Sequence, residues 1–259
     1  MNICLFTQEE ICRPLSMSDE RAEHLLRILH KKEGDSFRAG IINGQAGTAV
    51  ITTIDHASST DSNPLGFIHF SFTPESDGKP LHPLVMIIGF PRPIQLKRLL
   101  RDMAGLGVCQ VHLVGTELGE KSYLKSDLAT TQAGTKMLLD GTVQAASTHV
   151  PLLVRHDSLL DCIQSLESDA LLHGESSLCM GLDNVKPEQS LSRFLLNNDK
   201  KKPSLYIAAI GSERGWTDNE RECLSDHGFA LLGMGQRVLR TETAATVCAS
   251  IVLSSMGAL

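Results

Sequence analysis

The sequence has 259 residues, of which 42% are hydrophobic and 21% are charged. This balance is typical of a globular protein with one large domain or two ordinary ones, and it excludes a disordered chain. No apolar run is long enough to span a bilayer, and no basic stretch precedes the first apolar residues, so we expect neither a membrane protein nor a signal peptide. The formal net charge of −6 argues against general affinity for nucleic acids but leaves room for a local basic patch.

The seven cysteines are scattered along the chain and form no C-x-x-C pair. Their spacing matches neither a zinc motif nor a disulfide framework. The cysteines therefore predict a reducing, cytoplasmic setting and no metal site.

Residues 1–72 are rich in short β-prone runs. We expect a strand at 3–6, a helix at 20–30, a meander over 35–54 that turns at Asn43-Gly44, and a strand at 67–72. Several short strands with one helix predict a small barrel. Residues 73–83 contain three prolines and little apolar content, so we interpret them as a linker between two domains.

Residues 84–259 alternate between apolar strands and amphipathic helices. Continuous apolar runs predict strands at 84–88, 111–114, 152–154, 170–173, 205–210 and 229–232. The segment after Pro93 follows the helical period, and a second helix is expected over 127–146. This alternation predicts an α/β domain with a largely parallel sheet.

One loop of this second domain has the pattern of a ligand site. The strand expected at 205–210 runs into Gly211-Ser212-Glu213-Arg214-Gly215, and Thr217-x-x-Glu220 then forms a capping box that starts a helix. Open α/β sheets bind ligands where a strand ends in such a turn. A tight loop without a ligand explains the same pattern equally well.

A second glycine turn lies at 232–243. Gly233-x-Gly235 does not continue as a dinucleotide-binding motif, because Val238 stands where a third glycine is needed. We expect Thr241 to cap the following helix, 243–256, which would place Glu242 in its first turn. That helix is apolar nearly all round, so it is buried either in a subunit interface or in the core of a monomer.

These two segments resemble the RsmE family of SPOUT methyltransferases. The family's motifs are similar to residues 211–217 and to the run Leu-Gly-x-Gly-x-Arg-Val-Leu-Arg-Thr-Glu-Thr-Ala at 232–244. The resemblance extends to His24-Leu25-x-Arg27-Ile28-Leu29 and to residues 97–114. It implies a PUA-like RNA-binding barrel followed by a SPOUT domain with a parallel sheet and a C-terminal trefoil knot. It also implies S-adenosylmethionine as cofactor, a homodimer, and methylation of a uridine N3 in ribosomal RNA or the small ribosomal subunit.

The resemblance also implies roles for individual residues. Uridine N3 carries a proton at neutral pH, so we expect Arg240, buried among the residues of this motif, to stabilise negative charge on the base oxygens. Glu242 would accept the proton, although the helix dipole also explains an acid at this position. Arg27, Arg92, Lys97 and Arg237 would contact RNA, and Arg237 could equally pair with a carboxylate across the dimer. The residues that would line the cofactor pocket are Leu172, Ile210, Gly211, Glu213, Gly215, Met234, Gly235, Val238 and Leu239.

The chain departs from the family pattern at positions expected to face RNA. The first motif has Ser212 and Arg214 where the family has proline and glycine, residues 143–147 lack the family's acid and arginine, and the basic loop is reduced to residues 89–93. Two alternatives therefore remain: a SPOUT protein that binds RNA without catalysis, and a methyltransferase that acts on a different RNA.

Overall fold

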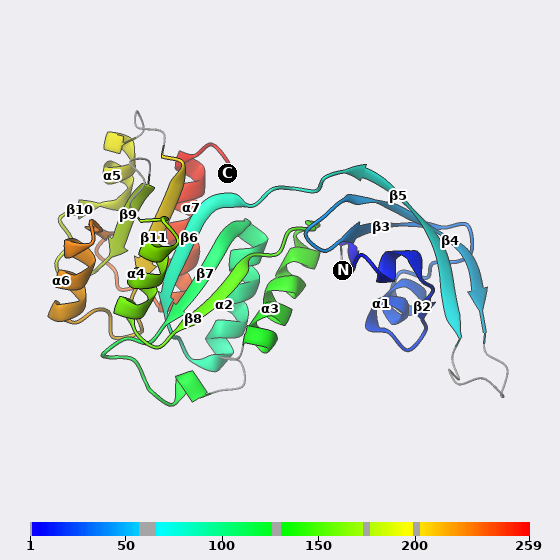
Figure 1. Ribbon diagram of the computed structural model, residues 1–259, viewed down its shortest axis with the longest axis horizontal. Coiled ribbons are helices and arrows are strands. Elements are labelled where there is room, and N and C mark those ends of the chain that lie inside the picture. Colours follow the sequence, from blue (N-terminus) through cyan, green and yellow to red (C-terminus); the bar gives the residue numbers. More distant parts are fainter. Residues whose placement is uncertain (1, 57–65, 126–130, 173–176, 199–202) are drawn as a thin grey trace. The chain divides into compact units, whose positions relative to one another are not determined.

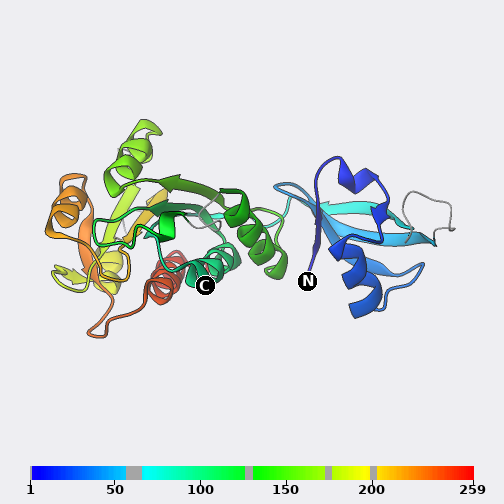
Figure 2. The same cartoon turned by 90° about the horizontal axis from the view of Figure 1, so that it is seen from below.

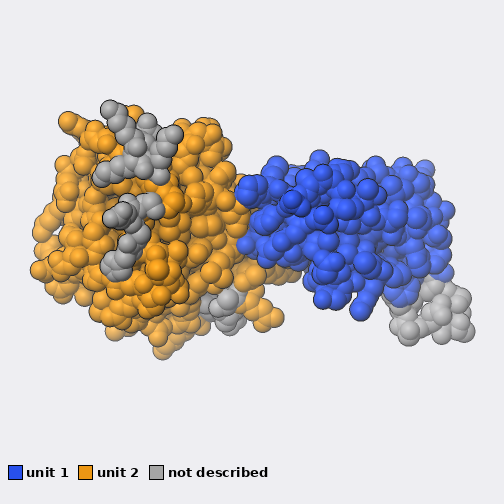
Figure 3. Space-filling model, turned by 45° about the horizontal axis from the view of Figure 1, so that its top comes forward, with its two compact units in different colours: residues 1–80, 142–150 blue, residues 81–141, 151–259 orange. Residues whose placement is uncertain are grey.

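The computed structural model describes residues 2–56, 66–125, 131–172, 177–198 and 203–259 (Figure 1). Contacts divide the chain into two compact units. Unit 1 consists of residues 1–80 and 142–150, and unit 2 consists of residues 81–141 and 151–259 (Figure 3). In the described residues, no helix is both long and apolar enough to cross a membrane.

Unit 1 is built on a five-stranded sheet with the order β1-β3-β4-β5-β2. β1 is parallel to β3, and the other neighbours are antiparallel. The strands are β1 (Cys4–Phe6), β2 (Leu15–Ser16), β3 (Ser36–Ile41), β4 (Ala46–Asp55) and β5 (Phe67–Ser76). The expected helix is a short α1 (Glu20–Glu23), capped by Asp19, which continues as a π-turn at His24–Ile28.

The tip of the β3–β4 hairpin is held by residues from beyond the predicted domain boundary. Asn43 adopts a positive φ of 57° in the predicted turn. Its side-chain Oδ1 accepts a hydrogen bond from the backbone N of Val150 at 2.8 Å, and the hydroxyl of Thr148 donates to the carbonyl of Gly44 at 2.7 Å. Residues 142–150 therefore belong to unit 1, although the sequence assigns them to the second domain.

The boundary between the two units also differs from the predicted linker at 73–83. β5 runs to Ser76, so residues 73–76 of the expected linker pair with β4, and the units divide after Pro80. The prolines here were interpreted as signs of a linker, but Pro74 lies within β5. The neighbouring strand β2 pairs only with residues 67 and 68 of β5, so the other edge of β5 is open at Pro74 and its missing N–H is tolerated.

Unit 2 is a seven-stranded parallel sheet with the order β10-β12-β9-β11-β6-β7-β8. Its strands are β6 (His82–Gly89), β7 (Val108–Val114), β8 (Leu152–His156), β9 (Ser177–Leu182), β10 (Gln189–Ser190), β11 (Leu205–Ile210) and β12 (Ala230–Gly233). Its helices are α2 (Pro93–Leu106), α4 (Leu159–Ser168), α5 (Leu191–Asn198), α6 (Asp218–Asp226) and α7 (Thr241–Ser255), together with most of α3 (Thr131–Gln144). Unit 2 thus has the parallel α/β sheet that the alternation predicted.

Helices cover both faces of this sheet. α2 and α7 lie on one face, and α4 and α6 lie on the other (Figure 2). The central strands β6 and β11 are therefore buried on both sides, as their continuous apolar runs predicted. α3 approaches α2 closely because residue 141 is glycine: a Cβ there would lie 2.5 Å from the carbonyl oxygen of Arg101.

The strand expected at 170–173 is wrong in its described part, 170–172. α4 ends here, with Ala170 in the left-handed region (φ 55°) and the backbone N of Leu171 bonded to the carbonyl of Leu166. Leu172 then packs into the core next to α4. A short apolar run does not distinguish a strand from the apolar residues that follow a helix cap. The true strand, β9, begins at Ser177.

The core of unit 2 also contains two histidines. His112 of β7 and His156 of β8 are 2% and 9% exposed, and their rings stack with an angle of 7° between the planes. Burial lowers the pKa of His112 to about 4, and burial also lowers the pKa of His156. Both imidazoles are therefore neutral near pH 7.

Candidate functional site

A cavity of about 200 Å³ lies at the carboxyl ends of β9, β11 and β12. The loops that follow these three strands form its walls, together with the first turns of α7. This edge of a parallel sheet is where α/β proteins bind ligands. The two glycine turns found in the sequence are thus neighbours in space.

Most residues expected to line a cofactor pocket border this cavity. They are Ile210, Gly211, Glu213, Gly215, Met234, Gly235, Val238 and Leu239. Leu172 is not among the lining residues that the structure describes, because it follows α4 and packs in the core. Leu182, the last residue of β9, lines the cavity instead.

The loop after β11 is a tight turn built on glycine. Ser212 and Gly215 form an isolated antiparallel bridge, and Gly215 has a φ of +73°. A Cβ on Gly211 would lie 2.8 Å from the carbonyl carbon of Gly215, so the two ends of the turn touch. Trp216, which is 2% exposed, donates its indole N–H to the carbonyl of Leu182 at 3.1 Å and joins the turn to β9.

The predicted capping box at the start of α6 is confirmed. The hydroxyl of Thr217 accepts a hydrogen bond from the backbone N of Glu220 at 3.2 Å. In return, the Glu220 carboxylate accepts from the backbone N of Thr217 at 2.9 Å. The box fixes the direction in which the chain leaves the glycine turn.

A buried ion pair is present at the wall of the cavity, and the sequence spacing gave no sign of it. The Asp183 side chain is fully buried and accepts hydrogen bonds from Arg221 Nε at 3.0 Å and Nη2 at 3.2 Å. The backbone N of Lys186 also donates to it at 2.7 Å. Burial acts to raise the pKa of Asp183, but the Arg221 guanidinium and the backbone donors outweigh it, so this pKa lies below the usual value.

We expect Asp183→Asn to lower the free energy of unfolding near neutral pH by about 3 kcal/mol, because Arg221 loses its buried partner. A carboxyl with a lowered folded-state pKa stabilises the protein above its unfolded pKa, and this contribution is lost as the pH falls below about 4. The deficit of the variant should therefore shrink in acid, as measured by urea unfolding across pH. Asp218→Asn, which removes the exposed partner of Arg221, is the matched control and should change little. A deficit that does not vary with pH would contradict the assignment.

The loop after β12 holds exposed side chains around the second glycine turn. Gly235 has a φ of +107°, and Val238 is 76% exposed although it is aliphatic. The expectation that Arg240 is buried is wrong: its side chain is exposed. The chain extends outward here to reach the start of α7, which leaves the intervening side chains uncovered.

Thr241 has a different role from the one predicted. The N-cap of α7 is Arg240, which makes no side-chain capping bond, and Thr241 is the first helical residue. The Thr241 hydroxyl is buried and donates to the carbonyl of Gly211 at 3.4 Å. It thereby ties the two glycine loops together. Glu242 lies in the first turn of α7, half-buried.

The residues expected to contact RNA are all exposed. Arg92 precedes α2, and both its backbone N and its side-chain Nε approach Glu213 Oε1, at 3.4 and 3.5 Å, so it lies beside the cavity. Arg237 lines the cavity itself, and Lys97 lies on α2. Arg27 belongs to unit 1, where it pairs with Glu23 at 3.0 Å.

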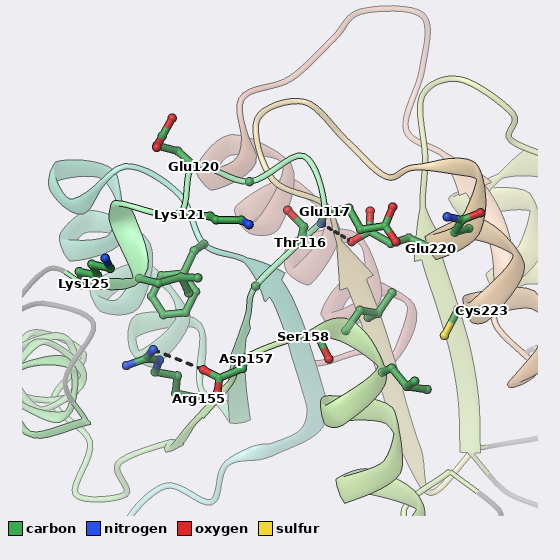
Figure 4. A pocket seen from close by; sticks show the side chains of 17 residues that line it. Thr116, Glu117, Glu120, Lys121, Lys125, Arg155, Asp157, Ser158, Glu220 and Cys223 are labelled. Carbon is green, nitrogen blue, oxygen red and sulfur yellow. Dashed lines mark hydrogen bonds and ion pairs between the residues drawn. The ribbon is translucent and has the colours of Figure 1, made fainter.

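A larger cavity of about 680 Å³ is present in unit 2, where the sequence predicted no site (Figure 4). It lies between the loop that follows β7 and the N-terminal ends of α4 and α6. The backbone N of Glu117 donates to the Glu220 carboxylate at 2.9 Å, and Arg155 pairs with Asp157 at 3.4 Å. Charges of both signs surround it, and neither glycine motif contributes to its wall. We therefore place the candidate site in the smaller cavity.

Comparison with known proteins identifies the family of the chain. Residues 78–253 match the family model described as RNA methyltransferase domain. The chain belongs to this RNA methyltransferase family. It is 41% identical to Ribosomal RNA small subunit methyltransferase E of Treponema pallidum, over 98% of this chain and 91% of the relative. It is 29% identical to Ribosomal RNA small subunit methyltransferase E 1 of Borreliella burgdorferi, over 98% of each chain. The resemblance to the RsmE family is thus confirmed.

Solved structures described as methyltransferases share the fold. A Ribosomal RNA small subunit methyltransferase E from Neisseria gonorrhoeae, bound to S-adenosyl methionine, superposes with a TM-score of 0.74 at 17% identity and covers 98% of this chain and 97% of that one. A methyltransferase from Legionella pneumophila in complex with the same cofactor gives a TM-score of 0.71 at 19% identity, with 98% of both chains covered. At these identities the match establishes the α/β architecture with its parallel sheet.

Proposed function

We propose that this chain is an S-adenosylmethionine-dependent enzyme that methylates N3 of a uridine in small-subunit ribosomal RNA. One observation carries the proposal: the two glycine turns of an RNA methyltransferase family member meet around one cavity at the carboxyl edge of the sheet. The name of the 41% identical relative supports the ribosomal RNA substrate, and the cofactor of the Neisseria structure supports the methyl donor.

The walls of the cavity fit this cofactor. Ile210, Leu232 and Leu239 offer apolar surface to an adenine ring, and the glycine turns offer backbone groups for hydrogen bonds. A Cβ on Gly235 would meet nothing within 4 Å, so there is open space over this turn. The Glu213 carboxylate lines the same cavity and suits a ligand that carries positive charge at its sulfonium and amino groups.

The residues around the cavity would orient the base and stabilise the negative charge that it carries after losing its proton. When bound, S-adenosylmethionine supplies an electrophilic methyl group. Uridine N3 carries a proton at neutral pH, so the enzyme must favour the deprotonated base. We assign Arg240 to stabilising negative charge on the base oxygens and Glu242 to accepting the N3 proton. Both lie at the start of α7, directly after the cavity-lining residue Leu239.

We propose that unit 1 is a PUA-like RNA-binding barrel, with Arg27 contacting RNA there and Arg92, Lys97 and Arg237 contacting it on unit 2. The five-stranded, mostly antiparallel sheet of unit 1 and the exposure of these side chains support this. Since net charge is −6, such contacts must be local. Ribosomal RNA as substrate supports action in the cytoplasm.

We further propose that the C-terminal segment is threaded as a trefoil knot and that the enzyme is a homodimer. The chain leaves β12, which pairs with β9, and returns through the loop after it to α7, which packs on β6 and β11. A groove of about 610 Å³ between α5 and α7 is lined by Leu195, Leu196 and Ile251, and Leu196 is 76% exposed. A second copy would cover this apolar surface. A monomer by light scattering would contradict the dimer.

Methyl transfer tests the proposal directly. Small subunits from a strain in which this gene is deleted should accept labelled methyl groups from S-adenosylmethionine, and mass spectrometry of the RNA should find 3-methyluridine. Calorimetric titration of the cofactor should precede this assay. Cofactor binding that cannot be measured would favour the alternative of an RNA-binding protein without catalysis. Transfer to another RNA but not to the small subunit would favour the alternative substrate.

A further inference from the structure

Three side chains that commonly bind metals converge in the core of unit 2. His112 lies in β7, His156 is the last residue of β8, and Cys162 lies in α4. The nearest ligand atoms of the three residues all lie within 4.8 Å of one another. His112 Nδ1 and His156 Nε2 are 2.9 Å apart. None of the three borders either of the cavities described above.

The hydrogen bond that His112 makes to a second residue is typical of a histidine that binds a metal. His112 Nε2 donates its proton to Gln110 Oε1 at 2.9 Å, which leaves the lone pair of Nδ1 facing His156. Histidines that bind metals usually donate their other ring N–H to a second residue in this way. Cys162 is fully buried in an apolar cluster with Val114 and Ile163, so its sulfur is shielded from solvent.

We propose that His112, His156 and Cys162 bind a thiophilic d¹⁰ metal ion, Zn²⁺ or Cu⁺. Two imidazole nitrogens and one sulfur are a donor set that such ions prefer. Nitrogens bound at about 2.0 Å in tetrahedral geometry lie about 3.3 Å apart, so the two nitrogens need to separate by a few tenths of an ångström from their present 2.9 Å. The Cys162 sulfur, which lies within 4.8 Å of them, needs to lie about 3.5 Å from each.

Proton and charge balance follow from the ligands. Binding releases the thiol proton of Cys162 and moves the ring proton of His156 from Nε2 to Nδ1, while His112 keeps its proton on Nε2. With one thiolate, Cu⁺ gives a neutral site that suits an apolar core, whereas Zn²⁺ leaves one positive charge and calls for a fourth ligand. In either form the ion would link β7, β8 and α4, and would stabilise the folded chain.

The test is the metal content of the purified, untagged full-length chain by mass spectrometry. We expect about one zinc or copper ion per chain in the wild type, and the element found distinguishes the two ions. Cys162→Ala should lose the ion. Cys179→Ala is the matched control, because Cys179 is buried in the same apolar cluster but lies in β9, and this variant should keep the ion. Equal metal content in both variants would place the ion elsewhere and overturn the proposal.

A second measurement needs no variant. The chain is stripped with a chelator and titrated with Zn²⁺, with Cu⁺ under anaerobic reducing conditions, and with Co²⁺. We expect the melting temperature to rise by several degrees with one of the first two ions. We also expect a thiolate-to-cobalt charge-transfer band with Co²⁺. A purified chain without metal that shows neither response would refute the site. Neither readout depends on methyl transfer, so the outcome is independent of the proposed function.

Discussion

Replacing Arg240 by alanine is expected to lower kcat for methyl transfer by about 10²- to 10³-fold, with Kd for S-adenosylmethionine changed by less than about twofold. The side chain is exposed at the N-cap of α7, directly after the cavity wall. It is therefore available to a base that docks over the cavity but is not required to form the cavity. Single-turnover transfer of labelled methyl groups measures the first quantity, and calorimetry measures the second.

Two further variants sharpen this test. Arg240→Lys retains the charge but not the planar pair of donors, so intermediate activity would show that paired hydrogen bonds to the base contribute. Arg193→Ala removes an exposed arginine from α5, and Arg193 does not line the cavity. It should leave kcat unchanged. Full kcat in Arg240→Ala would refute the electrostatic role.

Gly211→Ala is expected to weaken cofactor binding at least about tenfold and to lower the free energy of unfolding by about 1–3 kcal/mol. The added Cβ would meet the carbonyl carbon of Gly215 at 2.8 Å and its Cα at 3.0 Å. These are backbone atoms, so a change of side-chain rotamer cannot relieve the clash and the loop itself must open. Calorimetric titration and urea unfolding give the two quantities.

The control for this change is Gly105→Ala in α2. A Cβ on Gly105 meets nothing within 4 Å, and alanine is favoured over glycine within a helix. This variant should bind cofactor normally and should be slightly more stable than the wild type. If Gly211→Ala is destabilised but binds cofactor normally, the glycine serves only the fold, and the turn is not a wall of the cofactor site.

Local sequence patterns predicted the parts of the site that depend on local physics. The strand at 205–210, the glycine turn after it and the Thr217–Glu220 capping box all involve residues close together in the chain. The family motif then placed both glycine loops in one pocket, and they meet around one cavity. Leu172 was predicted to line the pocket but does not border this cavity. Its apolar run follows a helix cap, and hydrophobic periodicity does not distinguish such a run from a strand.

Other features depend on contacts between distant segments, which no local pattern encodes. The Asp183–Arg221 pair joins the end of β9 to α6, and residues 142–150 pack on a hairpin of unit 1. The cluster of His112, His156 and Cys162 was also missed, because its three residues come from three different elements. In addition, the spacing of the cysteines argued against any metal site. Arg240 was expected to be buried among the residues of its motif, but its side chain is exposed.

Trp216 is the only tryptophan in the sequence. Its indole N–H donates a hydrogen bond to the carbonyl of Leu182, a residue that lines the cavity. Its fluorescence therefore originates at the edge of the candidate site and nowhere else in the chain. The intrinsic fluorescence of Trp216 can therefore be used to follow cofactor binding and the opening of the glycine turn in real time, without a label.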